Sequence, residues 1–481
     1  MDEETAWARE EFGNADLGDA RRNHRLIRLA ARVAQQPGGT IAGVCRSAAE
    51  RQAAYDLMSN KKVRSEALLQ ATTAATAGRC AEHEFVYVPV DGSSLVLTDR
   101  AKTKPLGSIG ATRFPTRGLK VVDAVAVAPD GTFNGILDVQ FWTRAAAKKK
   151  RRKSQKKPSR HLRRRKRDTE MKHWSASVES VNQVLEKHAP GVRSWFVMDR
   201  EADESKLLRQ LRTGWHMVHD PGCPGPRGRV ARQVDETVLG GERGEASGST
   251  RLAGPSIALV CCPYCEGRHS RKVPETNAPY VRAARRAGRA RSRRGRSPRS
   301  AEHQHAHSLG PAHEPSRGEA RGRRARHRQL SRAWRIEEFH RTWKAGGCDA
   351  ENIHLRSADG IRKWAILLAS VAARTEHLKR LARTQPDEPA TCELTEDEIQ
   401  VLIFAKRRIK TSVELVPDGI PPIKTAVRWI ADLGGWAGHY TKYEPGSTTI
   451  ARGLVELARY MEFFSAIAEH PELAKKLMKK R

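Results

Sequence analysis

The chain has no long hydrophobic run and few cysteines. Its longest apolar stretch, Trp364–Ala373, is too short to span a bilayer. Met1–Phe12 is acidic and has no apolar segment of the kind found in secretory signals. Eight cysteines in a chain of 481 residues, without such a signal, indicate reduced thiols rather than a disulfide framework. We therefore expect a cytoplasmic protein with no membrane partner.

Large apolar residues are also nearly absent from one long internal stretch. Arg282–Gln329 holds fifteen arginines, three glutamates and a single large apolar residue, Leu309. Nothing in this stretch could offset the entropy of ordering a buried strand, so we expect it to be disordered. Lys148–Arg167, with fourteen basic residues and no acid, predicts a second self-repelling loop.

The overall charge favours a polyanionic partner. The formal net charge is +33, and nucleic acid is the common partner of such basic chains. The two basic stretches contribute +14 and +12, which is +26 of this total. The remainder is only mildly basic, so charge alone does not locate a binding face.

Hydrophobic periodicity divides the chain into helical ends and a strand-rich middle. Asp19 is expected to cap a basic amphipathic helix that runs to Val33, and Ala48–Met58 forms a second helix. Strands are expected over Phe85–Val90, Lys120–Ala128, Phe133–Trp142 and Trp195–Met198. Further helices are expected over Thr169–Lys187, Trp334–Trp343, Lys363–Leu381, Glu396–Arg408, Ile423–Leu433 and Ala451–Ala468.

Three acids stand at positions suited to binding metal. Asp91 and Asp199 each follow a short apolar strand, where ligands collect in open α/β sheets, and Glu337 lies on an expected helix. Three such carboxylates could hold two Mg²⁺ ions, which activate a water or a 3′-hydroxyl and stabilise the leaving oxygen at a phosphodiester. The plainer interpretation is that these are three ordinary surface residues among 55 acids.

Several motifs resemble the insertion-sequence-four group of DDE transposases and follow that family's order. The strongest is the segment Trp334–Lys344 around Glu337, together with Asp199-Arg200-Glu201-Ala202-Asp203. Further likenesses are Leu17-Gly18-Asp19-Ala20-Arg21-Arg22, Leu433-Gly434-Gly435 and the first-aspartate motif Asp91-Gly92-Ser93-Ser94-Leu95, which is weak alone.

The resemblance implies a bacterial DNA transposase that acts by cut-and-paste. Its catalytic and metal-binding residues would be Asp91, Asp199 and Glu337, with Mg²⁺ as the cofactor and Mn²⁺ as a substitute. Its partners would be double-stranded DNA, both the element's ends and the target, and a second copy of the chain in a synaptic complex. The residues expected to contact DNA are Arg21, Arg22, Arg25, Arg335, His340 and Lys344.

The implied fold is α/β, with a ribonuclease-H-like core between helical ends. The expected order begins with a helical domain that binds DNA ends at residues 1–78, and the first part of the core follows at 79–217, with a basic loop at 146–168. A β-insertion would occupy 218–329, the second part of the core 330–385, and a helical dimerisation domain 386–481.

Two departures from the family pattern suggest an impaired copy. Leu330 and Ala333 stand where the family has the Tyr and Arg of its Tyr, Arg, Glu, Lys signature, residues that contact the DNA end. An apolar strand is also missing from the insertion. Reading Ser308–Glu314 one base later can encode Ala-Trp-Val-Leu-Leu-Thr-Ser, so we favour a compensated frameshift that is restored before Trp334; the sequence does not fix its start, for which Val218 is the earliest position. The alternative is a genuine basic loop.

Other interpretations remain open from the sequence. Cys262, Cys265 and His269 invite a zinc site, but a fourth ligand at suitable spacing is missing. The main rival to an active transposase is a decayed copy that binds DNA ends without cutting them. A structure-specific nuclease on the same core is a third, weaker interpretation.

Overall fold

The computed structural model describes residues 6–99, 101–109, 116–143, 170–198, 335–408, 416–438, 443–470 and 472, together with the backbone of two short strands at 216–219 and 256–259. Asp199, both basic stretches, the cysteine motif at 262–265, Leu330 and Ala333 lie outside these residues. The chain separates into one unit made of Met1–Cys261 and Gln329–Arg481 and a second unit, Cys262–Arg328, that falls wholly outside the described residues.

The amino-terminal part is helical, as expected. Its helices are α1 (Ala6–Phe12), α2 (Ala20–Gln35), α3 (Ile41–Val44), α4 (Ala48–Ser59) and α5 (Ser65–Cys80). The predicted cap of α2 is confirmed, since the Asp19 carboxylate accepts a hydrogen bond from the Arg21 backbone N–H. Ser47 and Glu50 form a capping box that begins α4.

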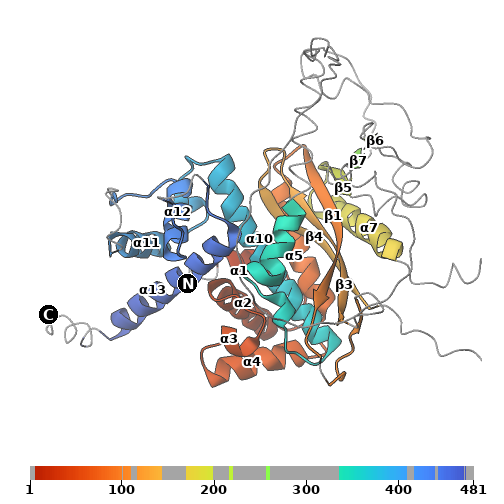
Figure 1. The fold of residues 1–481 in the computed structure, drawn as a ribbon, viewed down its shortest axis with the longest axis horizontal. Coiled ribbons are helices and arrows are strands. Elements are labelled where there is room, and N and C mark those ends of the chain that lie inside the picture. Colours follow the sequence, from red (N-terminus) through yellow and green to blue (C-terminus); the bar gives the residue numbers. More distant parts are fainter. Residues whose placement is uncertain are drawn as a thin grey trace, which may run out of the picture. The chain divides into compact units, whose positions relative to one another are not determined.

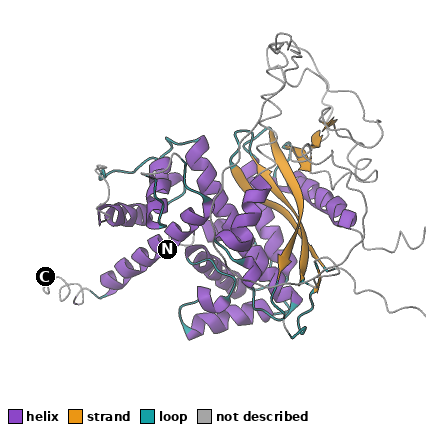
Figure 2. Cartoon of the chain, in the orientation of Figure 1, coloured by secondary structure: helices purple, strands orange, loops and turns teal. Residues whose placement is uncertain are grey.

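A mixed sheet fills the middle of the chain (Figures 1 and 2). Its strands are β1 (Phe85–Val96), β2 (Gly107–Ser108), β3 (Arg117–Val127), β4 (Phe133–Trp142), β5 (Arg193–Met198), β6 (His216–His219) and β7 (Ser256–Leu259). The order is β2-β3-β1-β5-β7-β6, with β4 paired to β3. β3 runs antiparallel to both β1 and β4. Three further pairs are parallel: β5 with β1, β7 with β5, and β6 with β7.

One expectation about β1 is wrong. The sequence suggested a strand that ends at Val90, just before Asp91, but β1 continues to Val96. The reason is a change of partner: the described pairing with β5 ends at Val90, while the antiparallel pairing with β3 runs on from Val90 to Val96. Asp91 therefore lies within a strand and is opposite Asp123 of β3.

The two faces of the sheet are covered by different helices (Figure 1). Even-numbered residues of β1 and β3, such as Val88 and Ala124, pack with α7 (Glu170–His188). Odd-numbered residues, such as Leu95 and Val125, pack in the cluster that contains α10 (Ala358–Thr384). This alternation is the period of a strand, and it places Asp91 and Asp123 on the α10 face.

The helices that follow form a separate buried cluster. They are α11 (Glu396–Arg408), α12 (Ile423–Leu433) and α13 (Ser447–Glu469), with the short turn η7 (Ala390–Cys392) before α11; another short turn, η6 (Ala350–Asn352), precedes α10. The cluster begins at Leu378, in the last turns of α10. The predicted helices over these ranges are confirmed, with α10 and α13 a few residues longer at their ends.

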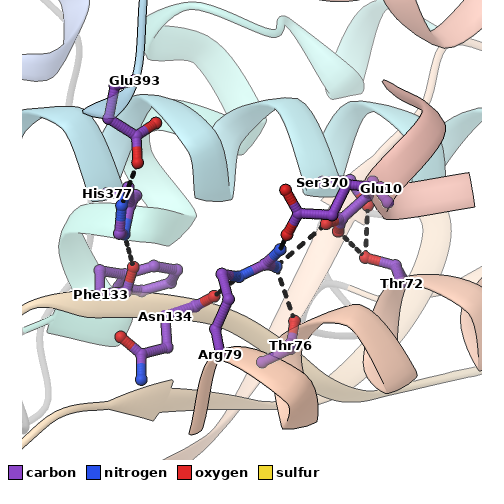
Figure 3. Close-up of polar contacts among 10 residues, drawn as sticks. Glu10, Thr72, Thr76, Arg79, Phe133, Asn134, Ser370, His377 and Glu393 are labelled. Atoms are coloured by element: carbon purple, nitrogen blue, oxygen red, sulfur yellow. Dashed lines mark hydrogen bonds and ion pairs between the residues drawn. The ribbon is translucent and has the colours of Figure 1, made fainter. Parts of the chain in front are cut away.

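The amino-terminal helices share the core of the sheet. A single buried cluster runs from Ala8 of α1 through β1, β3 and β4 to Ala373 of α10. Arg79 of α5 joins the same elements by polar contacts (Figure 3): it donates to Glu10 of α1 at 2.7 Å and to the Asn134 carbonyl of β4 at 2.8 Å. Arg79, which directly follows the predicted domain boundary at residue 78, therefore connects α5 to α1 and to the sheet.

Candidate functional site

The helix that carries Glu337 lies against the α10 face of the sheet. Residues 335–341 are α-helical, and the chain continues as a π-helix, η5 (Thr342–Gly346). Ile336, Phe339 and Trp343 form its buried stripe, at most 4% exposed. The Trp343 indole donates to the Ala365 carbonyl of α10 at 3.0 Å, which fixes the helix against the core.

Glu337 itself is exposed, and it lies beside Asp91. The ligand atoms of Asp91, Glu337 and His340 all lie within 4.8 Å of one another. Asp91 is partly buried and its carboxylate accepts a hydrogen bond from the Gly92 backbone N–H at 2.7 Å. The structure thus brings together two of the three predicted acids; Asp199 follows β5 directly but lies outside the described residues.

His340 is buried between two aspartates. Its Nε2 lies 2.8 and 2.9 Å from the two carboxylate oxygens of Asp123, and its Nδ1 lies 3.6 Å from Oδ2 of Asp91. Asp123 is fully buried. Burial lowers the pKa of His340, but the carboxylates of Asp123 and Asp91 outweigh it, so the pKa is raised above its ordinary value.

Sequence reasoning missed the role of Asp123. A signal was present, because an aspartate stands among valines and alanines in the strand Val121-Val122-Asp123-Ala124-Val125. At a core-facing position such an acid needs a buried partner. His340, expected to contact DNA, is that partner and is only 5% exposed.

Lys344 links the helix to the strand that bears Asp91. Its ammonium donates a hydrogen bond to the Ser93 hydroxyl, two residues beyond Asp91 on the same face of β1. A cation is therefore held close to the acids, where it can offset part of their mutual repulsion.

Arg335 takes part in a network of buried charges behind the Glu337 helix. Glu338 pairs with Arg335 at 3.3 Å, with Lys379 at 3.5 Å and closely with Arg380. Burial and the neighbouring Arg380 lower the pKa of Arg335 to about 10. Burial raises the pKa of Glu338, but Lys379 and Arg380 bring it below its usual value. Arg335 is therefore engaged in this network, whereas Glu337 lies beside Asp91.

The remaining expected DNA contacts lie on α2. Arg21 and Arg25 are exposed, and Arg22 is partly buried, with a hydrogen bond of 2.8 Å to the Leu17 carbonyl. Arg28 extends this exposed row, whereas Arg32 is 9% exposed and pairs with Glu462 of α13 at 2.8 Å. One face of α2 therefore offers arginines to solvent and the other holds the core.

Comparison with known families bears on this amino-terminal part. Residues 4–63 match the family model described as transposase DNA-binding. The match covers α1 to α4, including the exposed arginines of α2. It supports a transposase and DNA as its partner. Within the described residues, no helix is both long and apolar enough to cross a membrane.

Proposed function

We propose that the protein is a DNA transposase of the DDE type, related to the insertion-sequence-four group. It would perform cut-and-paste transposition by hydrolytic cleavage and strand transfer at the element's ends, acting as a homodimer. The observation that carries this proposal is the meeting of Asp91 and Glu337, distant in sequence, in a chain that begins with a transposase DNA-binding segment.

The order of the sheet supports the ribonuclease-H-like core that the resemblance implies. An antiparallel meander of β1, β3 and β4 is followed by α7 and by β5, which returns parallel to β1. Val90 is opposite Met198 in this pairing, and each is followed in sequence by one of the two aspartates. This register supports Asp199 as the third acid.

The donor set suits a divalent cation. Asp91, Asp199 and Glu337 would hold Mg²⁺, with Mn²⁺ as a substitute, because carboxylate oxygens are the usual ligands of both ions. When bound, the metal supplies Lewis-acid activation of the attacking oxygen and stabilisation of the leaving oxygen. The exposure of Glu337 leaves the site accessible to a DNA backbone, and Lys344 places a positive charge beside it.

The proposal is tested by cleavage of a plasmid that carries the encoding element and its flanking DNA. The full chain should cut at the element's ends in MgCl₂ and not in EDTA. Asp91→Asn and Glu337→Gln should abolish cutting while DNA binding persists. Glu66→Gln, on an exposed position of α5, is the matched control and should cut as well as the unaltered chain.

The second candidate is a copy that binds DNA ends without cutting, favoured by Leu330 and Ala333 at the positions of two signature residues. The double variant Leu330→Tyr/Ala333→Arg separates the two. If it cuts and the unaltered chain does not, the protein is an impaired transposase. If neither cuts, yet both bind the element's ends, the transposase activity proposed here is rejected in favour of the binding remnant.

A further inference from the structure

The contacts of His340 define which ring nitrogen carries a proton. Nε2 faces both oxygens of the buried Asp123 carboxylate, at 2.8 and 2.9 Å, and a carboxylate can only accept. Nε2 therefore donates. In the neutral ring the other nitrogen, Nδ1, then carries a lone pair on the side of Asp91.

The separation between Nδ1 and Asp91 suits a shared cation better than a direct hydrogen bond. At 3.6 Å from Oδ2, Nδ1 is beyond the roughly 2.7–3.2 Å of an N–H···O bond. Two ligands that each lie about 2.1 Å from one ion are about 3 to 4 Å apart. Glu337 completes the set, since donors of all three side chains lie within 4.8 Å of one another.

We propose that His340 binds the catalytic cation directly through Nδ1, and that Asp123 is the positioning residue that fixes its tautomer. This inference rests on the proposed metal-dependent transposase. Metal-binding histidines generally donate their other N–H to a carboxylate, which orients the ring. Here the strand β3 supplies that carboxylate and the Glu337 helix supplies the ring, so the sheet and the helix are held together at the metal site.

A nitrogen ligand changes which ion the site prefers. Imidazole suits the later transition metals, whereas an all-oxygen site suits Mg²⁺. A site with Asp91, Glu337 and His340 should therefore bind Mn²⁺ and Co²⁺ more tightly than Mg²⁺. The competing arrangement is a charged His340 that bridges Asp91 and Asp123 without touching the metal.

Pulsed electron paramagnetic resonance of Mn²⁺ bound to the full chain distinguishes the two arrangements. A directly bound imidazole gives a ¹⁴N coupling to the manganese, which a bridging histidine would not give. His340→Gln should remove the coupling that arises at this site and weaken Mn²⁺ binding at least tenfold by calorimetry. Asp123→Asn should weaken binding by about 10- to 100-fold, the range typical of residues that orient a metal ligand.

His377 provides a matched control. It is partly buried on α10, and its ring nitrogens lie 2.8 Å from a Glu393 carboxylate oxygen and 2.8 Å from the Phe133 carbonyl oxygen (Figure 3). Among the described residues it belongs to no cluster of three possible metal ligands. His377→Gln should therefore leave the manganese spectrum unchanged.

A second variant tests the inference if His340→Gln does not fold. Asp91→Asn should reduce the Mn²⁺ affinity and with it the ¹⁴N signal at a given Mn²⁺ concentration, because Asp91 and His340, whose ligand atoms lie within 4.8 Å of each other, would bind the same ion. If Asp91→Asn leaves both the Mn²⁺ affinity and the ¹⁴N coupling unchanged, the coupling arises from another histidine of the chain and the inference is rejected.

The remaining outcomes separate this inference from the proposed function. Mn²⁺ binding that depends on Asp91 but lacks a ¹⁴N coupling would overturn the role of His340 and leave the metal-dependent function standing. Binding that is indifferent to both Asp91→Asn and Glu337→Gln would overturn the metal site itself.

Discussion

Single residues in this core show how burial decides the behaviour of a charge. Asp138 of β4 is 1% exposed, and the Gln140 amide donates to both of its carboxylate oxygens at 3.1 and 3.0 Å. Burial nevertheless dominates and raises the pKa of Asp138 to about 6. The folded state therefore favours the protonated acid, whose ordinary pKa is 3.8.

This shift predicts a loss of stability as the pH rises. The pKa of Asp138 is higher in the folded state than in the unfolded state. Its contribution to the free energy of unfolding is therefore fully present below about pH 4 and disappears as the pH passes about 6. Two pKa units correspond to about 3 kcal/mol. Asp138→Asn should flatten the free energy of unfolding between these pH values, as measured by urea denaturation. Glu66→Gln is the control, and an unchanged pH profile in Asp138→Asn would contradict the assignment.

At the scale of elements, α2 has one face that packs in the core and another that exposes arginines to solvent. Its buried face, with Leu26, Ala30 and Val33, belongs to the core, while Arg21, Arg25 and Arg28 stay exposed. Arginines on one face of a helix can neutralise DNA phosphates, and each contact releases counterions. The transposase DNA-binding match covers this helix, so we expect its exposed face to lie on DNA.

Replacement of all three exposed arginines by glutamine tests this expectation. The association constant for DNA fragments that carry the element's ends should then depend less steeply on salt. The negative slope of its logarithm against the logarithm of the salt concentration should become smaller in magnitude by up to about 3, close to 0.9 for each phosphate that is no longer neutralised. Fluorescence anisotropy over a range of KCl concentrations measures it. Arg452→Gln/Arg459→Gln, on exposed positions of α13, should change the slope little. An equal change in both variants would mean that only general charge had been removed.

At the scale of the whole molecule, the DNA-binding segment is part of the folding unit. Its first helix contributes to the cluster that also contains the sheet and α10. Trp364 and Lys363 of α10 donate to the Gly39 and Met58 carbonyls at 3.1 and 3.0 Å. Deletion of the first eighty residues would expose this core, so loss of DNA binding in such a variant would say little about DNA recognition.

Arg79→Met tests the link between this segment and the sheet. Arg79 pairs with Glu11, which is 2% exposed, and removal of one partner leaves the other charge buried and uncompensated. We expect a loss of about 3–5 kcal/mol in the free energy of unfolding. Glu10→Ala removes the exposed half of the same network and should cost less than about 1 kcal/mol. If chemical denaturation shows equal losses of unfolding free energy for Arg79→Met and Glu10→Ala, the buried pair of Arg79 and Glu11 does not stabilise this contact more than the exposed pair does.

The sequence by itself determined most of the helices and strands in the described residues. Periodicity and capping residues are local signals, and this is why α2, α4, β4, α11 and α12 lie where they were expected, within a residue or two at their ends. The motif around Glu337 also pointed to the correct helix, because its buried stripe repeats with the period of a helix.

Tertiary structure alone decided what surrounds that acid. β1 continues past Asp91 only because β3 pairs with it there, and Asp123 becomes a partner of His340 only when β3 and the Glu337 helix meet. These residues are 217 positions apart, so no local pattern records their contact. The same holds for Arg79, whose position on α5 gives no sign that it joins α1 to β4. The same packing of distant elements buries His340, which was predicted to contact DNA, and places it near Asp91 and Glu337.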